Sequence, residues 1–380
     1  MTNLFLYGTL RHPGLLELVA GRPLDVLAPE AARLPGYLAR LAEGHDFPII
    51  AETPGAVAEG LLLRDVGRDV RARLDYYELS FGYDCREVMA EVAGEAVPAE
   101  IYFPRPGLWE PGAAFSLELW TRDHWPLTRH SAREVMGYHG VLSGDEVSHR
   151  WRMIRTRAAA AEMAAREAVP CAVRSGMAAA DVEDLGADLS HVGFFLLKTL
   201  HLRHRRFDGA MSEALEREVF IPGDAATVLP YDPVRDRVLL IEQFRMGPWA
   251  RGDGHPWQLE PIAGRIDGGE SAESSAFREA VEEAGLRLLR LEPVARYYGT
   301  PGYSSEMFHS FIGIADLPDG VAGLGGEEAE HEDIRSHVLS FEAAMALIGT
   351  GEANNGPLIL SLLWLARERD RLRAEAGDAS

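Results

Sequence analysis

The chain has 380 residues, of which 47% are hydrophobic and 26% are charged, so its composition is that of a globular protein and its length favours two domains. The formal net charge of −21 argues against a broad surface for nucleic acid or anionic membrane, and any anionic ligand must be held by clustered arginines or a metal ion. Cys85 and Cys171 have no metal-like spacing, and neither a signal peptide nor a membrane-spanning run is predicted, so we expect a cytoplasmic protein.

The first hundred residues are expected to form a small α+β domain, because short apolar runs alternate with turn signals over residues 3–105. Expected strands cover residues 4–7, 57–63, 86–92 and 98–104, and expected helices cover residues 12–21 and 69–79. A tight glycine turn, YGTL, follows the first strand, and its backbone N–H groups can hold a carboxylate. Glu78 stands at the end of the second helix, where an acid is either solvated or faces a ligand.

A long helix is predicted over residues 145–168, because apolar residues recur there at helical spacing and a proline follows. Small and acidic residues then predict a linker. The predicted boundaries are a first domain at 1–170, a linker at 171–186 and a second domain at 187–380. In the second domain we expect strands within 192–207, 226–232 and 237–245, and an amphipathic helix over 358–376.

An acidic helix is the most informative feature of the second domain. The stretch GRIDGGESAESSAFREAVEEAGL, residues 264–286, places Glu279, Glu282 and Glu283 on about a third of one helix face. Like charges four residues apart repel, and acid is disfavoured at a helix C-terminus. A hard divalent cation such as Mg²⁺, with Mn²⁺ as an alternative, would offset this repulsion. The competing interpretation is a solvated acidic face.

The full spacing G-x5-E-x7-R-E-x-x-E-E-x-G favours the metal site, because chance would produce it in such a chain only on the order of once in 10⁴ to 10⁵. The pattern resembles the Nudix box, and further stretches of residues 190–370 resemble the ADP-ribose pyrophosphatase branch of that family. The resemblance implies an α/β/α sandwich, a homodimer paired through the Nudix domain, and magnesium-dependent hydrolysis of ADP-ribose to AMP and ribose 5-phosphate.

The same resemblance implies a role for each matching residue. The metal ligands would be Glu279, Glu283, Glu332 and the carbonyl of Ala263. Glu282 would assist them, and Glu330 would align the attacking water. For the substrate, the implied contacts are Phe194 and Arg217 on adenine, Arg245 on the diphosphate and Glu306 on the terminal ribose. Two alternatives stay open: hydrolysis of another nucleoside diphosphate sugar, and a non-catalytic ADP-ribose sensor.

The YGTL turn and Glu78 together resemble the gamma-glutamylcyclotransferase-like, or AIG2-like, fold. The resemblance implies a small β-barrel, a ligand loop formed by Tyr7, Gly8, Thr9 and Leu10, and Glu78 as the catalytic carboxylate. One glutamate can take a proton from an α-amine and return it to the leaving amine. The alternative is a module that binds a ligand without turnover. The pairing of the two domains resembles tellurite-resistance-associated Nudix proteins.

Overall fold

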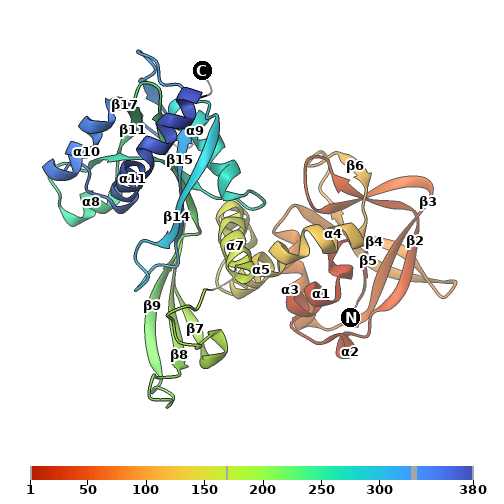
Figure 1. The fold of residues 1–380 in the computed structure, drawn as a ribbon. Helices are drawn as coiled ribbons and strands as arrows, with labels where there is room; N and C mark the ends of the chain where they lie inside the picture. The colour runs from red at the N-terminus through yellow and green to blue at the C-terminus, as the bar shows by residue number, and fades with distance from the viewer. Residues whose placement is uncertain (1, 168–169, 327–331, 379–380) are drawn as a thin grey trace. The chain divides into compact units, whose positions relative to one another are not determined.

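The computed structural model describes residues 2–167, 170–326 and 332–378. The chain divides into two compact units, Met1–Arg166 and Glu167–Ser380. The first unit contains a six-stranded sheet, and the second contains an eight-stranded and a three-stranded sheet (Figure 1). Helices accompany the sheets in both units, so the predicted α+β class is confirmed. Within the described ranges, no helix is long and apolar enough to cross a membrane.

Five strands of the first unit close into a barrel. The elements of this unit are β1 (Thr2–Leu6), η1 (Thr9–Arg11), α1 (Pro13–Ala20), α2 (Leu24–Leu27), β2 (Glu30–Ala42), β3 (Pro48–Val66), α3 (Arg68–Leu79), β4 (Tyr83–Val92), β5 (Glu95–Pro104), β6 (Pro111–Ala114), α4 (Leu117–Asp123), α5 (Trp125–Gly137), α6 (Gly144–His149) and α7 (Trp151–Arg166). The strand order is β3-β1-β5-β4-β2, and β3 also pairs with β2, so the ring has no free edge between them.

Alternate residues of these strands fill the barrel with an apolar core that includes Phe5, Leu34 and Ile101. A Cβ on Gly60 of β3 would lie 2.3 Å from the Phe5 ring, so only glycine lets that ring occupy the interior. The long β2–β3 hairpin was predicted only at residues 57–63, because few of its other residues alternate cleanly between apolar and polar.

The predicted helix over 145–168 is wrong in one respect, since the segment forms two helices. Ser143 caps α6 with a capping box, accepting a bond from the N–H of Glu146 while that glutamate accepts from the N–H of Ser143. Arg150, at φ −97° and ψ 1°, interrupts the helical geometry before α7 begins. The apolar spacing continues across this break, so sequence periodicity does not reveal it.

The second unit is built around β10, which pairs in parallel with β15 and antiparallel with β11 and β13. Its elements are η2 (Ala179–Asp181), β7 (Val182–Val192), β8 (Leu196–His204), β9 (Leu215–Ile221), β10 (Ala225–Asp232), β11 (Arg237–Phe244), α8 (Met246–Arg251), β12 (Trp257–Glu260), β13 (Ile262–Arg265), α9 (Ala272–Ala284), β14 (Arg290–Tyr298), β15 (Met307–Ile314), β16 (Leu324–Gly325), β17 (Ile334–Ser340), α10 (Phe341–Thr350) and α11 (Gly356–Asp378). The predicted strands at 226–232 and 237–245 and the C-terminal helix are confirmed.

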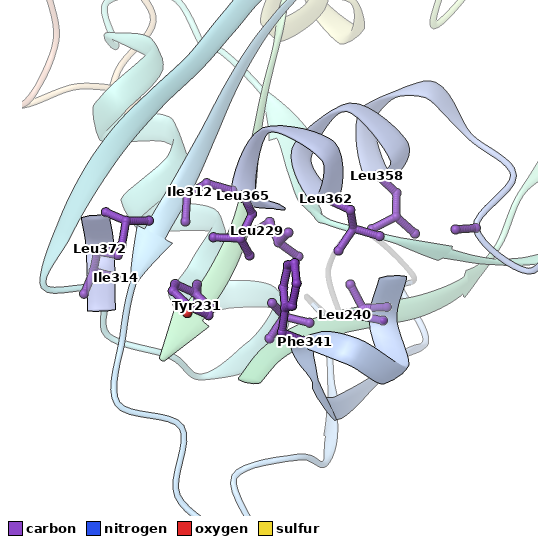
Figure 2. Packing of buried hydrophobic residues seen from close by; sticks show 13 residues of the cluster. Leu229, Tyr231, Leu240, Ile312, Ile314, Phe341, Leu358, Leu362, Leu365 and Leu372 are labelled. Atoms are coloured by element: carbon purple, nitrogen blue, oxygen red, sulfur yellow. The ribbon is translucent and has the colours of Figure 1, made fainter. Parts of the chain in front are cut away.

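Helices cover both faces of the eight-stranded sheet. Figure 2 shows leucines of α11 pointing toward Leu229 and Tyr231 of β10, with Phe341 of α10 in the same cluster. Successive residues of a strand face opposite sides. Val228 therefore lies on the other side of the sheet, where its side chain and that of Leu288 both lie close to Gly313. The helix α9 packs on β10 and β13. The resulting α/β/α sandwich places the acidic helix against the central strands, as the Nudix resemblance implied.

The three-stranded sheet β7–β8–β9 precedes the sandwich in the chain. Because β7 begins at Val182, the last five residues of the segment 171–186 belong to a strand and not to a linker. Nearly every residue of β7 is exposed, so the strand has no buried face. Its sequence therefore lacks the apolar alternation by which strands are recognised.

Candidate functional sites

The acidic helix α9 is fixed at both ends. Ser271 caps its N-terminus, accepting a bond from the N–H of Ser274 (3.1 Å), and Gly285 ends it in the left-handed region at φ 59°. The helix lies so close to β13 that a Cβ on Gly264 would fall 1.7 Å from Oε1 of Glu279. The first glycine of the box is thus required because it leaves room for a carboxylate.

One arginine organises three of the box carboxylates. Arg278 donates from Nε and Nη2 to the two oxygens of Glu270, at 2.9 and 3.0 Å. Its Nη1 donates to Glu279 and to Glu282, both at 2.7 Å. This fork holds the acids in fixed positions and offsets part of their charge. Arg278 therefore joins Glu270, Glu279 and Glu282 in one hydrogen-bonded network.

The remaining box carboxylate is almost completely enclosed. Glu283 is 1% exposed and accepts a hydrogen bond from the N–H of Ala263 at 3.1 Å. Burial raises its pKa well above the usual range, and the nearby charges of Glu279 and Glu332 raise the pKa further. Burial also raises the pKa of Glu279, to about 7, against the lowering effect of Arg278. Glu279, Glu283 and Glu332 therefore form one electrostatic cluster.

The cluster fits a divalent cation by charge and by donor type. It offers hard oxygen donors, and its acids raise one another's pKa, which a bound cation would reverse. Among the described residues, no three His, Cys, Asp or Glu side chains converge with the geometry of a metal site. The cluster thus has the charge and donor type of a metal site but not its geometry. Arg278 accounts for part of this difference, because its hydrogen bonds draw Glu279 and Glu282 toward the guanidinium. Glu330 lies outside the described residues, and its role stays a prediction.

The predicted diphosphate-binding residue lies near this cluster. Arg245 donates from Nε to Glu260 at 2.8 Å. Burial lowers the pKa of Arg245, but the charge and hydrogen bond of Glu260, and then the charges of Glu283 and Glu332, raise the pKa above its usual value. Glu260 was missed by the sequence reasoning. It stands in the stretch that precedes the box, where nothing distinguishes an arginine partner from an ordinary surface acid.

The predicted nucleoside contacts fall in two places. Phe194 is 62% exposed, and the guanidinium of Arg265 lies 5.6 Å from its ring centre. Arg265 also approaches Glu306 at 3.9 Å, and burial raises the pKa of Glu306. Arg217 pairs with Leu200 in the β8–β9 ladder, whereas Phe194 lies in the turn before β8, six residues from Leu200 along the chain. The two predicted adenine contacts therefore come from different parts of the three-stranded sheet, the turn before β8 and the strand β9.

Sequence reasoning also missed Arg265, which links the ring of Phe194 to Glu306. It occupies a variable position of the box pattern, so the motif gives no signal for it. Only the meeting of β13 with the segment before β8 reveals its place.

The first unit contains a cavity of about 480 Å³ that brings together its predicted site residues. Glu78 reaches the cavity from the last turn of α3, and the turn between β1 and η1 forms the adjoining wall. All four predicted loop residues line it, namely Tyr7, Gly8, Thr9 and Leu10. The juxtaposition of Glu78 with the YGTL turn is therefore as expected.

The YGTL loop leads into a short helical turn that is closed by two backbone hydrogen bonds. The N–H of Arg11 donates to the carbonyl of Gly8 (3.1 Å), and that of His12 to the carbonyl of Thr9 (2.9 Å). The N–H groups of Gly8, Thr9 and Leu10 come before the first hydrogen bond of this turn. Like the first N–H groups of any helix, they have no carbonyl acceptor within the turn. They are suited to an anionic ligand group.

Burial dominates the electrostatics of this cavity. It raises the pKa of Glu78 to about 8, so the free carboxyl holds its proton at neutral pH. The hydroxyls of Tyr7 and Tyr83 are also buried, and the nearby charge of Glu78 adds to the raised pKa of each. Tyr83 donates to the carbonyl of Pro48 at 2.9 Å. An enclosed carboxyl with a pKa near neutrality is suited to general acid–base chemistry.

Comparison with known proteins assigns both units. The profile of the NUDIX domain matches residues 222–362, and that of the gamma-glutamyl cyclotransferase, AIG2-like family matches residues 4–122. The ADP-ribose pyrophosphatase of Escherichia coli (strain K12) is 42% identical over 195 residues, which cover 51% of this chain and 92% of that protein.

Two further relatives match the same half. The GDP-mannose pyrophosphatase of Citrobacter koseri (strain ATCC BAA-895 / CDC 4225-83 / SGSC4696) is 33% identical over 172 residues, covering 45% of this chain and 88% of that protein. A crystal structure of an ADP compounds hydrolase is 21% identical, with a TM-score of 0.41, and covers 51% of this chain and 97% of the other. The chain therefore belongs to the Nudix family through its second unit, and its first unit is an AIG2-like gamma-glutamyl cyclotransferase domain.

Proposed function

We propose that the second unit hydrolyses ADP-ribose to AMP and ribose 5-phosphate. The observation that carries the proposal is the acidic cluster of α9, with Glu279 fitted against Gly264 and Glu283 enclosed beneath Ala263. Similarity to ADP-ribose pyrophosphatases over 92% of their length supports the choice of substrate.

The residues of the site divide the work of the reaction. Glu279, Glu283, Glu332 and the carbonyl of Ala263 would hold Mg²⁺ or Mn²⁺, which supplies positive charge against the diphosphate oxygens. Arg278 keeps the carboxylates in place. Arg245 faces the same charges and would transfer part of its hydrogen bonding from Glu260 to the diphosphate.

A water molecule attacks one phosphorus atom, and the bridging P–O bond breaks. Glu330 would accept the proton of that water, and Glu282 would assist in ordering the site. Arg265 and Glu306 would orient the ribose and base, and the contacts of Arg265 with both Phe194 and Glu306 support this role.

Two alternatives follow from the same geometry. The relationship to a GDP-mannose pyrophosphatase supports another nucleoside diphosphate sugar as substrate. A non-catalytic ADP-ribose sensor would keep the substrate contacts without needing the acids. The presence of every acid of the box argues against the sensor.

A substrate panel tests the proposal. The full-length protein is incubated with ADP-ribose, GDP-mannose and other nucleoside diphosphate sugars, with Mg²⁺ or with EDTA, and the products are identified by chromatography. We expect AMP and ribose 5-phosphate from ADP-ribose, with Mg²⁺ only. Faster turnover of another sugar would change the substrate, and binding without turnover would indicate the sensor.

A homodimer is part of the proposal, because Phe194 and Arg217 come from different parts of the three-stranded sheet. The separation in the β8–β9 ladder supports a site that takes one of them from each subunit. Co-expression of Phe194→Ala and Arg217→Ala chains tests this, since the mixed dimer would regain one intact site. We expect partial recovery of the KM for ADP-ribose. No recovery, or a fully active monomer in light scattering, would contradict shared sites.

For the first unit we propose cyclisation of γ-glutamyl amides to 5-oxoproline, supported by the cavity that joins Glu78 to the loop N–H groups. The α-amine nitrogen attacks the γ-carbonyl carbon, and the amide C–N bond breaks. In its ionised form Glu78 would take the proton from the α-amine and deliver it to the leaving amine. Formation of 5-oxoproline by the wild type, but not by Glu78→Gln, is the expected result. Ligand binding without product would indicate a binding module.

A further inference from the structure

The cavity of the first unit is larger than a γ-glutamyl head group requires. Its volume of about 480 Å³ lies within the roughly 300–1,000 Å³ of sites that enclose drug-sized ligands. The head group would occupy the end formed by Glu78 and the Gly8–Leu10 turn. The rest of the cavity is left for the amine part of the substrate.

Two groups of aromatic side chains form the walls of this remaining space. In one group Phe81 and Trp151 lie with ring centres 4.7 Å apart. In the second group Trp109 lies 5.0 Å from Phe47 and 5.2 Å from Tyr83. Such walls favour a flat or apolar group, because aromatic rings bury a large area and pair in offset or edge contacts.

The second wall is packed as closely as the backbone allows. A Cβ on Gly82 would lie 2.3 Å from the side chain of Leu108 and 3.0 Å from that of Trp109. Gly82, at φ 85°, also adopts a conformation that favours glycine. The loop that carries Trp109 is therefore seated directly on the end of α3, close to Glu78.

Apart from Glu78, the ionisable acidic and basic side chains that line the cavity are exposed. These side chains are His45, Arg105 and Asp145. Arg105 is also engaged with Asp84, to which its Nε donates at 3.1 Å. A substrate with a strongly charged amine part would gain contacts only at these exposed side chains, while an uncharged ring would fill the interior.

Part of the wall that contains Trp151 comes from outside the family domain. The AIG2-like match ends at residue 122, whereas Asp145, Ser148 and Trp151 come from α6 and α7. Arg155 of α7 donates to Asp46 at 2.7 Å, which ties this helix to the hairpin that supplies Phe47. The added helices thus complete the cavity around the amine part of a ligand.

We infer that this site selects γ-glutamyl amides whose amine part is a flat aromatic group, packed among the aromatic side chains that include Trp151 and Trp109. The inference rests on the proposed cyclotransferase function for the identity of the head group. The aromatic amine would be the leaving group, and it would depart with the proton carried by Glu78. Trp151 is then a specificity-determining residue supplied by α7.

Calorimetry on the full-length Glu78→Gln protein tests the inference without turnover. The ligands are γ-glutamyl anilide, γ-glutamyl methylamide and ε-(γ-glutamyl)lysine. We expect the anilide to bind about 10–100 times more tightly than the methylamide, the gain for burying one ring. In this background Trp151→Ala should reduce the preference to about threefold or less. Leu119→Ala, which removes an exposed leucine outside the cavity, should leave the preference unchanged.

Three results would overturn the inference: equal binding of anilide and methylamide, tighter binding of the lysine compound, or an unchanged preference in a folded Trp151→Ala protein. If that variant does not fold, Leu108→Ala examines the wall next to Trp109, and an unchanged preference there would count against the inference. The absence of 5-oxoproline from the wild type, with the anilide preference intact, would refute the cyclotransferase proposal alone. Failure of every amide to bind would refute both.

Discussion

The two candidate sites both place a glutamate in the last turns of a helix, but they handle its charge differently. Glu78 stands in a cavity among buried tyrosine hydroxyls, and burial alone raises its pKa to about 8. Glu279 and Glu283 are also buried, yet each additionally faces other carboxylates, and Arg278 binds Glu279. A single enclosed carboxyl can hold its own proton, whereas neighbouring carboxyls can give up their protons to share one cation.

The difference separates two kinds of chemistry. A proton-holding carboxyl such as Glu78 is suited to moving a proton between amines. Clustered acids such as Glu279 and Glu283 are suited to a metal ion and a phosphorylated substrate. Substitutions that remove one charge from each site should therefore have different consequences.

The largest effect is expected for Glu283→Gln. This change removes one charge from the cluster while keeping the shape of the side chain, and we expect turnover of ADP-ribose to fall at least about a hundredfold. Steady-state assays with varied Mg²⁺ measure the loss. Glu273→Gln, an exposed position of the same helix, is the matched control and should retain wild-type rates. Normal turnover and metal dependence in Glu283→Gln would contradict the metal-site assignment.

A smaller effect is expected for Arg278→Lys. Lysine keeps the positive charge but loses the planar fork that reaches Glu270, Glu279 and Glu282 together. We expect kcat to fall about tenfold while KM for ADP-ribose changes by less than about twofold, because positioning is lost and substrate contacts remain. Arg251→Lys, at an exposed arginine, provides the control. A change confined to KM would show that Arg278 acts on the substrate instead.

The smallest effect is expected in the pH dependence of stability. The pKa of Glu78 is raised on folding, so between about pH 4.5 and 8 the folded state binds a proton that the unfolded state has lost, and wild-type stability decreases as pH rises. Glu78→Gln does not titrate. Its melting temperature relative to wild type should therefore be highest near pH 9, by about 3–6 °C, and should converge near pH 4.5.

Thermal unfolding at several pH values measures this effect, with the exposed Glu52→Gln as control. A difference in melting temperature that does not change with pH would mean that Glu78 is not protonated in the folded state.

Much of the second site could be predicted from sequence, because most of its acidic residues lie close together in one short segment of the chain. The spacing of Glu279, Glu282 and Glu283 fixes one helix face, and Gly285 ends that helix as expected. Arg265 and Glu260 could not be predicted, since their partners come from other segments of the chain.

The first site was predictable only in its head-group end. The YGTL turn and Glu78 line the same cavity as expected, whereas the contribution of Trp151 to the cavity wall was not predicted. Trp151 shares the helical spacing of core residues such as Ile154, so periodicity assigns both to the core. Strand β7 was likewise missed, because its residues lack a buried face. In each case the sequence does not show which part of the folded protein, or solvent, surrounds the residue.

The central claim is that the acidic face of α9 binds a divalent cation, and titration with Mn²⁺ followed by electron paramagnetic resonance tests it most directly. The free-ion signal reports binding without any need for turnover. The wild type and Glu273→Gln should bind Mn²⁺ with the same affinity, and the double substitution of Glu279 and Glu283 to glutamine should bind at least about tenfold more weakly. Equal Mn²⁺ affinity in the wild type and the double variant would contradict the account.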